Sequence, residues 1–418
     1  MRARGSWGLA GGGRRLVGCA AAGLAVLFAG QTAAAASAPE SDGRFVGVNA
    51  GVLLQPGMSL GLRPGAVDAE LRLMARVGVR SLRIGLWWKY IQPYPTWAQV
   101  PRAQRRWYVR TPGAPTSFVF ADALFAAAAR RGLTLLPVLG GAPAWAAVNP
   151  EPRGEVIGNP PRDLEAFASW SGLMVARYGS RGAFWAEHPE LPHRPPGAWQ
   201  VWNEPNIWPA WSAPDWVHGY AALLHATAPA IRAADPAARI VLAGLTNESW
   251  TALDQLYGAV DRSDFDVVAI HPYTRYKADV VKILRSVRAV MSRHGDAARP
   301  LWVTEIGWPI ATRALRMRYG FETDAAGQVA LMRAILPALL RRRAALGLER
   351  VYWESWVTRY RQAWNPFDFA GLRRVSRGRI LPAAAFHEFR VVLRRIVRAG
   401  SATRPRVAGA NPAARRLR

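Results

Sequence analysis

Cysteine is almost absent from this chain. Of the 418 residues, Cys19 is the one cysteine, and it lies in a stretch that we expect to be removed on export. A mature chain without thiols excludes disulfide bridges, thiolate metal sites and a cysteine nucleophile. The lack of disulfides sets no limit on folding, because a chain of this length buries enough apolar surface for a stable core.

Lysine is nearly absent as well. It occurs at Lys89, Lys277 and Lys282 only, so arginine supplies almost all of the formal net charge of +27. A charge of this size can indicate a polyanionic partner, but arginine with abundant alanine, glycine and proline is also typical of a GC-rich coding sequence. No recognisable nucleic-acid module accompanies the charge. We therefore expect no nucleic-acid partner, while an acidic polymer remains an alternative to a purely compositional origin.

The apolar run near the N-terminus, Leu16–Gly30, is too short to span a bilayer comfortably. It is followed by Thr32–Ala38, which is rich in small residues and offers Ala-x-Ala cleavage sites. A basic region precedes it, made of Arg2, Arg4, Arg14 and Arg15. This order predicts a signal peptide and cleavage region over residues 1–38, and hence a secreted or cell-envelope protein.

Two anchored alternatives stay open for this region. Leu16-Val17-Gly18-Cys19 resembles a lipobox, although its apolar run follows the cysteine, whereas in a true lipobox the run precedes it. An uncleaved helical anchor is the second alternative. The Arg14-Arg15 pair gives weak support to twin-arginine export.

Strand-like and helix-like segments alternate regularly after the signal. The expected strands are Arg44–Asn49, Val79–Trp87, Leu133–Leu139, Ala198–Trp202, Arg239–Ala243, Phe265–Ile270, Leu301–Thr304 and Arg350–Ser355. The expected helices are Pro64–Val77, Phe118–Arg131, Asp163–Tyr178, Pro214–Ala234, Trp250–Val260, Ala278–His294, Thr323–Leu346 and Pro382–Val397. Because the strands are apolar on both faces, they predict a parallel sheet that is buried on both sides.

Eight strand–helix units predict a single-domain α/β fold, a (β/α)8 TIM barrel, over residues 39–399. The stretch at 400–418, rich in alanine, proline and arginine, is expected to be a basic disordered tail. A doubly wound open sheet is the alternative fold. Its dinucleotide-binding version is disfavoured, because no Gly-x-Gly-x-x-Gly turn follows the first strand.

Two glutamates stand at the ends of strands on opposite sides of this barrel. Glu204 lies in Trp202-Asn203-Glu204-Pro205-Asn206, after the fourth strand, and Glu305 lies in Thr304-Glu305-Ile306-Gly307-Trp308, at the seventh. Both would face the mouth at the carboxyl ends of the strands, where TIM barrels carry their active sites. Retaining glycosidases need two carboxylates about 5–5.5 Å apart, and the long aromatic βα loops suit sugar rings.

Together these motifs resemble those of clan A glycoside hydrolases, most closely families 39 and 5. The likeness covers most of residues 44–398, because further segments match the family pattern in the same order. These are Leu82-Arg83-Ile84, Trp88-Lys89-Tyr90-Ile91-Gln92-Pro93, Gly141-Ala142-Pro143-Ala144-Trp145, His271-Pro272-Tyr273, Tyr352-Trp353-Glu354-Ser355-Trp356 and Phe369-Ala370-Gly371-Leu372. The resemblance implies a retaining O-glycosyl hydrolase for β-glycosidic bonds that needs no metal and no organic cofactor.

The resemblance also implies a role for each matching residue. Glu204 would be the general acid/base, and Glu305 the nucleophile that forms a glycosyl-enzyme intermediate. Asn203 would hydrogen-bond the substrate 2-hydroxyl. The other expected roles are donors to Glu305 from Arg83 and Tyr273, a lining role for His271, substrate contacts from Trp88 and Trp145, and a floor beneath the sugar from Trp356 or, less favoured, Trp353.

The motifs do not specify the substrate. Long loops favour an oligo- or polysaccharide, and the loop after the second strand would favour an anionic one if its arginines face the cleft. These are Arg102, Arg105, Arg106 and Arg110. If they face solvent, composition explains them. The alternative function is a non-hydrolytic carbohydrate-binding or envelope polysaccharide-assembly protein on the same scaffold. A monomer is expected, with envelope association as an option.

Three other titratable residues are interpreted as structural and not as parts of a catalytic or metal site. Glu354 alternates with the tryptophans of the eighth strand and is a candidate buried partner for an arginine. His218 and His225 lie two turns apart on an expected helix and are interpreted as helix surface. Since no third ligand accompanies the two histidines, no metal site is predicted there.

Overall fold

The computed structural model describes residues 44–51, 53–54, 62–63, 65–150, 158–361 and 364–402. The chain divides into two compact units, Met1–Ala38 and Pro39–Arg418, and all described residues belong to the second. The predicted signal peptide at 1–38 lies outside the described residues, as does most of the predicted tail. Residues 400–402, the start of that predicted tail, are the end of the last helix, Ala384–Ala402.

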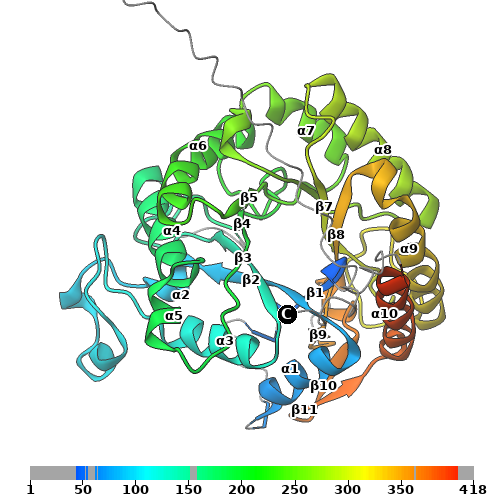
Figure 1. Cartoon of the computed structure of the whole chain (residues 1–418), viewed down its shortest axis with the longest axis horizontal. Coiled ribbons are helices and arrows are strands. Elements are labelled where there is room, and N and C mark those ends of the chain that lie inside the picture. Colours follow the sequence, from blue (N-terminus) through cyan, green and yellow to red (C-terminus); the bar gives the residue numbers. More distant parts are fainter. Residues whose placement is uncertain are drawn as a thin grey trace, which may run out of the picture. The chain divides into compact units, whose positions relative to one another are not determined.

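Eight strands in the described part of the chain form one parallel sheet in the order β5-β4-β3-β2-β1-β8-β7-β6 (Figure 1). They are β1 Val46–Asn49, β2 Ser81–Trp87, β3 Thr134–Gly140, β4 Ala198–Val201, β5 Arg239–Val241, β6 Val268–Ile270, β7 Leu301–Ile306 and β8 Leu348–Trp353. Two isolated parallel bridges, Val241 to Val267 and Leu245 to Ile270, bring β5 and β6 together. The predicted (β/α)8 barrel is confirmed. The open doubly wound sheet is wrong, because β1 pairs with both β2 and β8.

A ring of helices surrounds the sheet and follows the chain order around it (Figure 1). Those that match the expected helices are α1 Ala66–Val77, α3 Val119–Arg130, α4 Leu164–Tyr178, α6 Trp216–Ala234, α7 Ser249–Tyr257, α8 Lys277–Arg293, α9 Ala325–Leu346 and α10 Ala384–Ala402. Two short helices were not predicted, α2 Trp88–Ile91 and α5 Ala183–Glu187. Within the described ranges, no helix is both long and apolar enough to cross a membrane.

Local sequence signals explain where the elements begin and end. All seven residues of β3 are buried, as expected for a strand between two layers. Helix α4 begins after Asp163, whose side chain accepts a hydrogen bond from the backbone N–H of Ala166. Helix α1 ends at Gly78, whose φ of 104° is a conformation that favours glycine. These caps set the helix lengths and so fix where the chain returns to the sheet.

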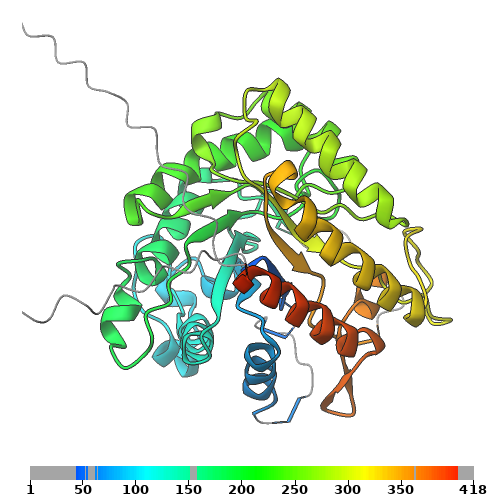
Figure 2. The same cartoon turned by 45° about the vertical axis from the view of Figure 1, so that its right-hand side comes forward.

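A small sheet that the sequence pattern did not predict lies in the loop after β8. It consists of β9 Val357–Thr358, β10 Arg373–Ser376 and β11 Arg379–Pro382. β10 and β11 form an antiparallel hairpin, drawn in orange in Figure 2. The sheet brings Arg373 to α1, where its Nη2 atom donates to Glu70 Oε1 over 2.9 Å. The loop is thereby tied to the first helix of the barrel.

Candidate active site

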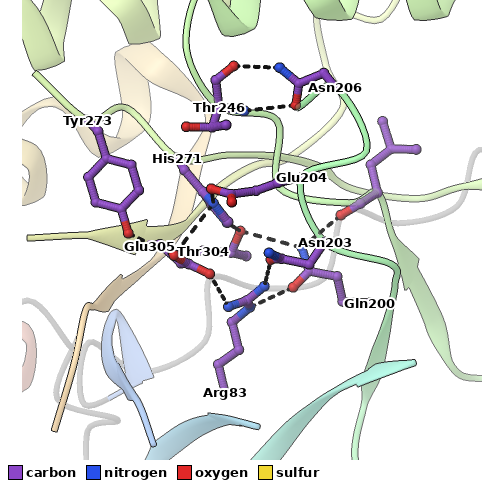
Figure 3. A network of polar contacts seen from close by, with 11 residues as sticks. Arg83, Gln200, Asn203, Glu204, Asn206, Thr246, His271, Tyr273, Thr304 and Glu305 are labelled. Carbon is purple, nitrogen blue, oxygen red and sulfur yellow. Dashed lines mark hydrogen bonds and ion pairs between the residues drawn. The ribbon is translucent and has the colours of Figure 1, made fainter. Parts of the chain in front are cut away.

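Glu204 and Glu305 meet at the carboxyl ends of β4 and β7 (Figure 3). Glu204 lies in a sharp turn in which Trp202 has a φ of 71° and Glu204 a φ of 48°, left-handed conformations that larger residues seldom adopt. The backbone N–H of Glu204 donates to Gly244 O over 3.2 Å. The indole of Trp202 donates to Ala210 O over 2.9 Å. Strain held in place by surrounding contacts is typical of functional sites.

Both carboxylate oxygens of Glu305 accept a hydrogen bond. Arg83 Nη1 donates to Oε1 over 2.6 Å, and the hydroxyl of Tyr273 donates to Oε2 over 2.7 Å (Figure 3). Burial alone would raise the pKa of Glu305, but His271, Arg83 and Tyr273 outweigh it and hold the pKa below its ordinary value. The surroundings therefore favour the ionised form of Glu305, which is the form that a nucleophile needs.

Glu204 has the opposite environment. Its Oε1 atom lies within hydrogen-bond distance of Nδ1 of His271, at 2.6 Å. Burial raises the pKa of Glu204, the negative charge of Glu305 raises it further, and His271 and Arg83 only partly oppose this. The surroundings therefore favour a protonated Glu204 beside an ionised Glu305. Two carboxyl groups with opposite shifts are the arrangement that separates an acid from a nucleophile at one pH.

The separation of the two carboxylates agrees with a two-step reaction. One oxygen of each lies within 4.8 Å of the other and of a ring nitrogen of His271. This is close to the separation of about 5–5.5 Å in retaining glycosidases and well below the roughly 6.5–9.5 Å in inverting ones. The three side chains could also hold a metal ion by their donor types. Hydrolysis by the two carboxylates needs no such ion.

Arg83 organises the floor of the site from β2. Its Nε atom donates to Gln200 Oε1 over 2.7 Å, and its Nη2 atom donates to Asn203 Oδ1 over 2.5 Å. Because a guanidinium can only donate, the atom of Asn203 that faces it is the oxygen. The amide nitrogen of Asn203 is then free to donate to a substrate hydroxyl. This orientation agrees with the predicted contact to the 2-hydroxyl, which stays a prediction.

Gln200 and Thr304 complete the network, and sequence reasoning missed both. Gln200 Nε2 donates to Leu242 O over 2.9 Å, and Thr304 Oγ1 lies 3.0 Å from Nε2 of His271. Each is a fully buried polar residue in a mainly apolar strand. That contrast was the signal that could have found them, because a buried polar side chain needs a partner inside the barrel.

His271 occupies a space that only a glycine opposite leaves open. Its ring is buried and lies against Gly244, where an added Cβ atom would overlap the ring nitrogen Nε2. Nearby, Asn206 Nδ2 donates to Thr246 O over 2.7 Å and joins the loops after β4 and β5 (Figure 3). Gly244 therefore limits the movement of the His271 ring on the side opposite Glu204.

Trp88 and Trp145, two of the predicted aromatic contacts to substrate, pack against each other. Trp88 is 1% exposed and packs against Trp145, Phe167 and Trp170. The predicted substrate contact of Trp88 is therefore wrong, because no face of its ring is open. Trp145 is half-buried and donates its indole N–H to Gln92 O over 2.9 Å. Its substrate contact stays a prediction.

Trp356 is not the floor of the site, and the prediction is wrong. The side chain is fully buried, and its indole N–H donates to Glu70 Oε2 on α1 over 2.8 Å. Its ring packs edge-on against Phe386 and Phe389 of α10. Trp356 therefore lies in the layer between the sheet and the helices. Trp353, the less favoured candidate, is also fully buried and packs on Trp308.

A group of aromatic rings beside Glu305 was not predicted. The ring of Phe321 stacks on Tyr273, with centroids 5.3 Å apart, and Tyr319 stacks on Phe321 at 6.0 Å. Phe367 contacts all three rings. Tyr319 and Phe321 come from the loop after β7 and Phe367 from the loop after β8. The rings support the tyrosine that donates to Glu305.

The arginines of the loop after β2 lie on its surface. Arg106 and Arg110 are exposed and stand over the rings of Trp107 and Trp97, with distances to the ring centroids of 4.7 Å and 4.4 Å. Each is therefore paired with an aromatic side chain of its own loop. His218 and His225 are exposed on α6, each beside an aspartate, in agreement with their interpretation as helix surface.

Comparisons with known proteins relate this chain to glycoside hydrolases. A family model described as glycosyl hydrolase family 53 matches residues 195–379, a range that includes both glutamates. A comparison with curated proteins finds no match. The family match and the shared fold below confirm the resemblance to clan A glycoside hydrolases and support a glycosidase.

Three solved structures illustrate the shared fold. A family 39 glycoside hydrolase from the gut symbiont Bacteroides cellulosilyticus WH2 has a TM-score of 0.58 and 17% identity, covering 84% of this chain and 64% of that chain. A monomeric β-xylosidase from Caulobacter crescentus CB15 has a TM-score of 0.57 and 17% identity, covering 85% and 68%. The family 53 catalytic domain from Ignisphaera aggregans has a TM-score of 0.51 and 20% identity, covering 85% and 96%. This chain thus spans less than two thirds of the first of these proteins.

Proposed function

We propose that this protein is an exported retaining glycosidase that cleaves β-glycosidic bonds in an oligo- or polysaccharide, with Glu204 as acid/base and Glu305 as nucleophile. The observation that carries the proposal is the pair of opposite pKa shifts, raised for Glu204 and lowered for Glu305, in carboxyls with oxygens within 4.8 Å of each other. A sugar-binding protein without turnover has no need of one protonated and one ionised carboxyl at this separation.

In the first step, the ionised carboxylate of Glu305 attacks the anomeric carbon. The carboxylic acid of Glu204 transfers its proton to the glycosidic oxygen, so that the leaving sugar departs as an alcohol. The hydrogen bonds from Arg83 and Tyr273 hold Glu305 in one orientation for this attack. The product of the step is an ester between the sugar and Glu305.

In the second step, Glu204 is ionised and takes a proton from water. The water oxygen attacks the anomeric carbon, and the carboxylate of Glu305 leaves. The positive charge of Arg83 favours the release of Glu305 as an anion. Two inversions give net retention at the anomeric carbon, and both glutamates return to their starting protonation states.

The location and assembly state are part of the proposal. The basic, apolar and small-residue segments within residues 1–38 support export, to the medium or to the cell envelope. A monomer suffices for the chemistry, because Arg83, His271 and Tyr273 reach the two glutamates from the same chain. The long loops after the strands favour a polymer or oligomer over a single sugar.

The proposal is tested by trapping the intermediate. A panel of 2-deoxy-2-fluoro β-glycosyl fluorides covering common hexoses and pentoses is incubated with the protein, and the labelled peptide is mapped by mass spectrometry. We expect one member to esterify Glu305, and proton NMR of a cleaved β-glycan to show the β-anomer first. The Glu349→Gln variant is the control, since Glu349 lies on β8 and pairs with Arg239. An α-anomer formed first would exclude the two-step mechanism, and binding of glycans without turnover would favour the alternative of a non-hydrolytic protein.

A further inference from the structure

A third glutamate stands at the end of β8, beside the nucleophile. The backbone N–H of Glu354 donates to Ile306 O over 2.8 Å, directly after Glu305 in β7. Gly307 faces Glu354 with so little room that an added Cβ atom would overlap the Glu354 carbonyl oxygen. Glu354 is thereby fixed at the mouth of the barrel, where TIM barrels bind their substrates.

The side chain of Glu354 is only partly satisfied by the protein. Asn49, at the end of β1, donates a hydrogen bond to it. Its Oε2 atom is buried and has no hydrogen-bond partner among the described residues. A buried carboxyl oxygen without a partner is costly, and a ligand group that hydrogen-bonds to it would remove that cost.

Among the residues that the structure describes, no arginine forms an ion pair with Glu354, so the expected arginine partner is not found there. Arg83 is the nearby cation that acts on its charge, but the Nε and both Nη atoms of Arg83 already donate to Gln200, Glu305 and Asn203. Burial raises the pKa of Glu354 well above its ordinary value, and the charge of Glu305 raises it further. The surroundings therefore favour the neutral carboxylic acid, which can both donate and accept.

The charge of a ligand group decides whether that group can hydrogen-bond to Glu354. A uronate carboxylate would be repelled by the ionised Glu305, and the nearby Arg83 already pairs with Glu305. An ammonium group of an amino sugar would have to approach a chain with a formal net charge of +27. A sugar hydroxyl carries no charge and pairs with either oxygen of the acid. The exposed arginines of the loop after β2 stack on that loop's own tryptophans and do not alter this balance.

We propose that Glu354 is a specificity-determining residue, which hydrogen-bonds a hydroxyl of the sugar that is attached to Glu305 and restricts this position to neutral sugars. The inference rests on the proposed glycosidase function and names the substrate class of the same site. Glu354 takes no part in bond making or breaking.

The test compares Glu354→Gln and Glu354→Ala with the wild-type protein. The probes are 4-nitrophenyl β-glycosides of glucose, galactose, xylose, mannose and glucuronic acid, neutral and uronic acid β-glycans, and monodeoxy analogues of the preferred sugar. Glu349→Gln is the matched control, because Glu349 lies on the same strand at the opposite end of the barrel, where it pairs with Arg239. Thermal unfolding of every variant separates loss of fold from loss of specificity.

The wild-type protein is expected to prefer a neutral glycoside or glycan. Glu354→Ala should lower kcat/KM on it by about 10- to 100-fold, as for the loss of a buried hydrogen bond in a binding site, and Glu354→Gln should keep most of it. For one monodeoxy analogue, kcat/KM with the wild-type protein should fall by the same factor relative to the unmodified sugar. For that analogue, Glu354→Ala should cause no further fall. The ratio of neutral to glucuronide cleavage should fall in Glu354→Ala and stay unchanged in Glu349→Gln.

Three results would overturn the inference. A wild-type preference for the uronic acid probes would reject the neutral class while leaving the glycosidase intact. Additive losses for Glu354→Ala and every monodeoxy analogue would show that the carboxyl touches no hydroxyl. No cleavage of any probe, together with no covalent label on Glu305, would instead reject the proposed glycosidase, and the inference would fall with it.

Discussion

The Nδ1 atom of His271 lies 2.6 Å from the Oε1 atom of Glu204. The imidazole is fully buried and is held from behind by Thr304 at 3.0 Å. This rigid hydrogen-bond partner thus fixes the direction in which the carboxyl group of Glu204 points. Since a general acid acts only on a bond within its reach, the position of this ring sets the efficiency of the first step.

The first prediction concerns Gly244, which leaves the space for that ring. Gly244→Ala places a methyl group on the imidazole, so His271 must move and Glu204 loses its orientation. We expect kcat/KM to fall by about 10- to 100-fold, which is the loss of rate expected when a general acid is misplaced. Aryl glycosides with better leaving groups should be affected least. Gly197→Ala is the control, because nothing lies near its added methyl group; an equal loss in that variant would contradict the assignment.

The second prediction concerns the pH profile. In the proposed mechanism, activity needs Glu305 ionised and Glu204 protonated, so the acid limb of kcat/KM would report Glu305 and the alkaline limb Glu204. The lowered pKa of Glu305 extends activity to lower pH, and the raised pKa of Glu204 extends it to higher pH. In Glu204→Gln the alkaline limb should vanish for an aryl glycoside with a good leaving group. A limb that persists in that variant assigns it to another group.

The third prediction concerns Tyr273. Tyr273→Phe removes the donor to Glu305 Oε2 and keeps the ring that stacks on Phe321. The pKa of Glu305 should then rise, because one contact that favours its ionised form is lost, and the acid limb should move to higher pH. We expect kcat to fall by about 10-fold, as for one hydrogen bond to a charged group. Tyr276→Phe is the control, since Tyr276 is an exposed tyrosine; an unmoved acid limb in Tyr273→Phe would contradict the role.

The fourth prediction separates stability from binding at Trp356. Trp356→Phe removes the indole N–H that donates to Glu70, so the free energy of unfolding should fall by about 1–3 kcal/mol. KM should stay the same, because the ring touches no substrate. Chemical denaturation and steady-state kinetics check the two halves. Trp364→Phe, at a site that is 64% exposed, should change neither stability nor KM; a raised KM in Trp356→Phe would restore the predicted floor.

The barrel could be predicted because burial on two faces leaves strands with few polar residues. β3 is buried throughout and apolar except for Thr134, and the strand that carries Glu305 is apolar except for Thr304 and Glu305 itself. The three-stranded sheet after β8 could not be predicted in this way. β9 has two residues, which is too short for any periodicity to emerge.

The site was predicted in its charged centre and not in its aromatic surroundings. Glu204, Glu305 and Arg83 follow from motifs at strand ends, where the chain direction is fixed by the sheet. Trp356 lies beyond the end of β8, so strand alternation no longer says which way it faces. Its partner Glu70 is far away in the sequence, and no local pattern reveals such a contact. The sequence showed that Glu354 lies at the end of the eighth strand, but it did not show which residues surround its side chain.

The join between β5 and β6 carries a consequence for how the protein responds to heat. Isolated bridges close the barrel there, and the backbone N–H of His271 donates to Leu245 O across that join over 2.7 Å. Because the pairing at this seam consists of isolated bridges instead of a continuous ladder, we expect it to open at a lower free energy than the strands around it. Because Gly244 and His271 stand on the seam, a transient opening there would uncouple the imidazole from Glu204 while the other strands stay paired. On warming, the protein would then lose catalytic activity before it unfolds globally. The backbone amides of the seam would exchange their hydrogens with solvent before those of β3.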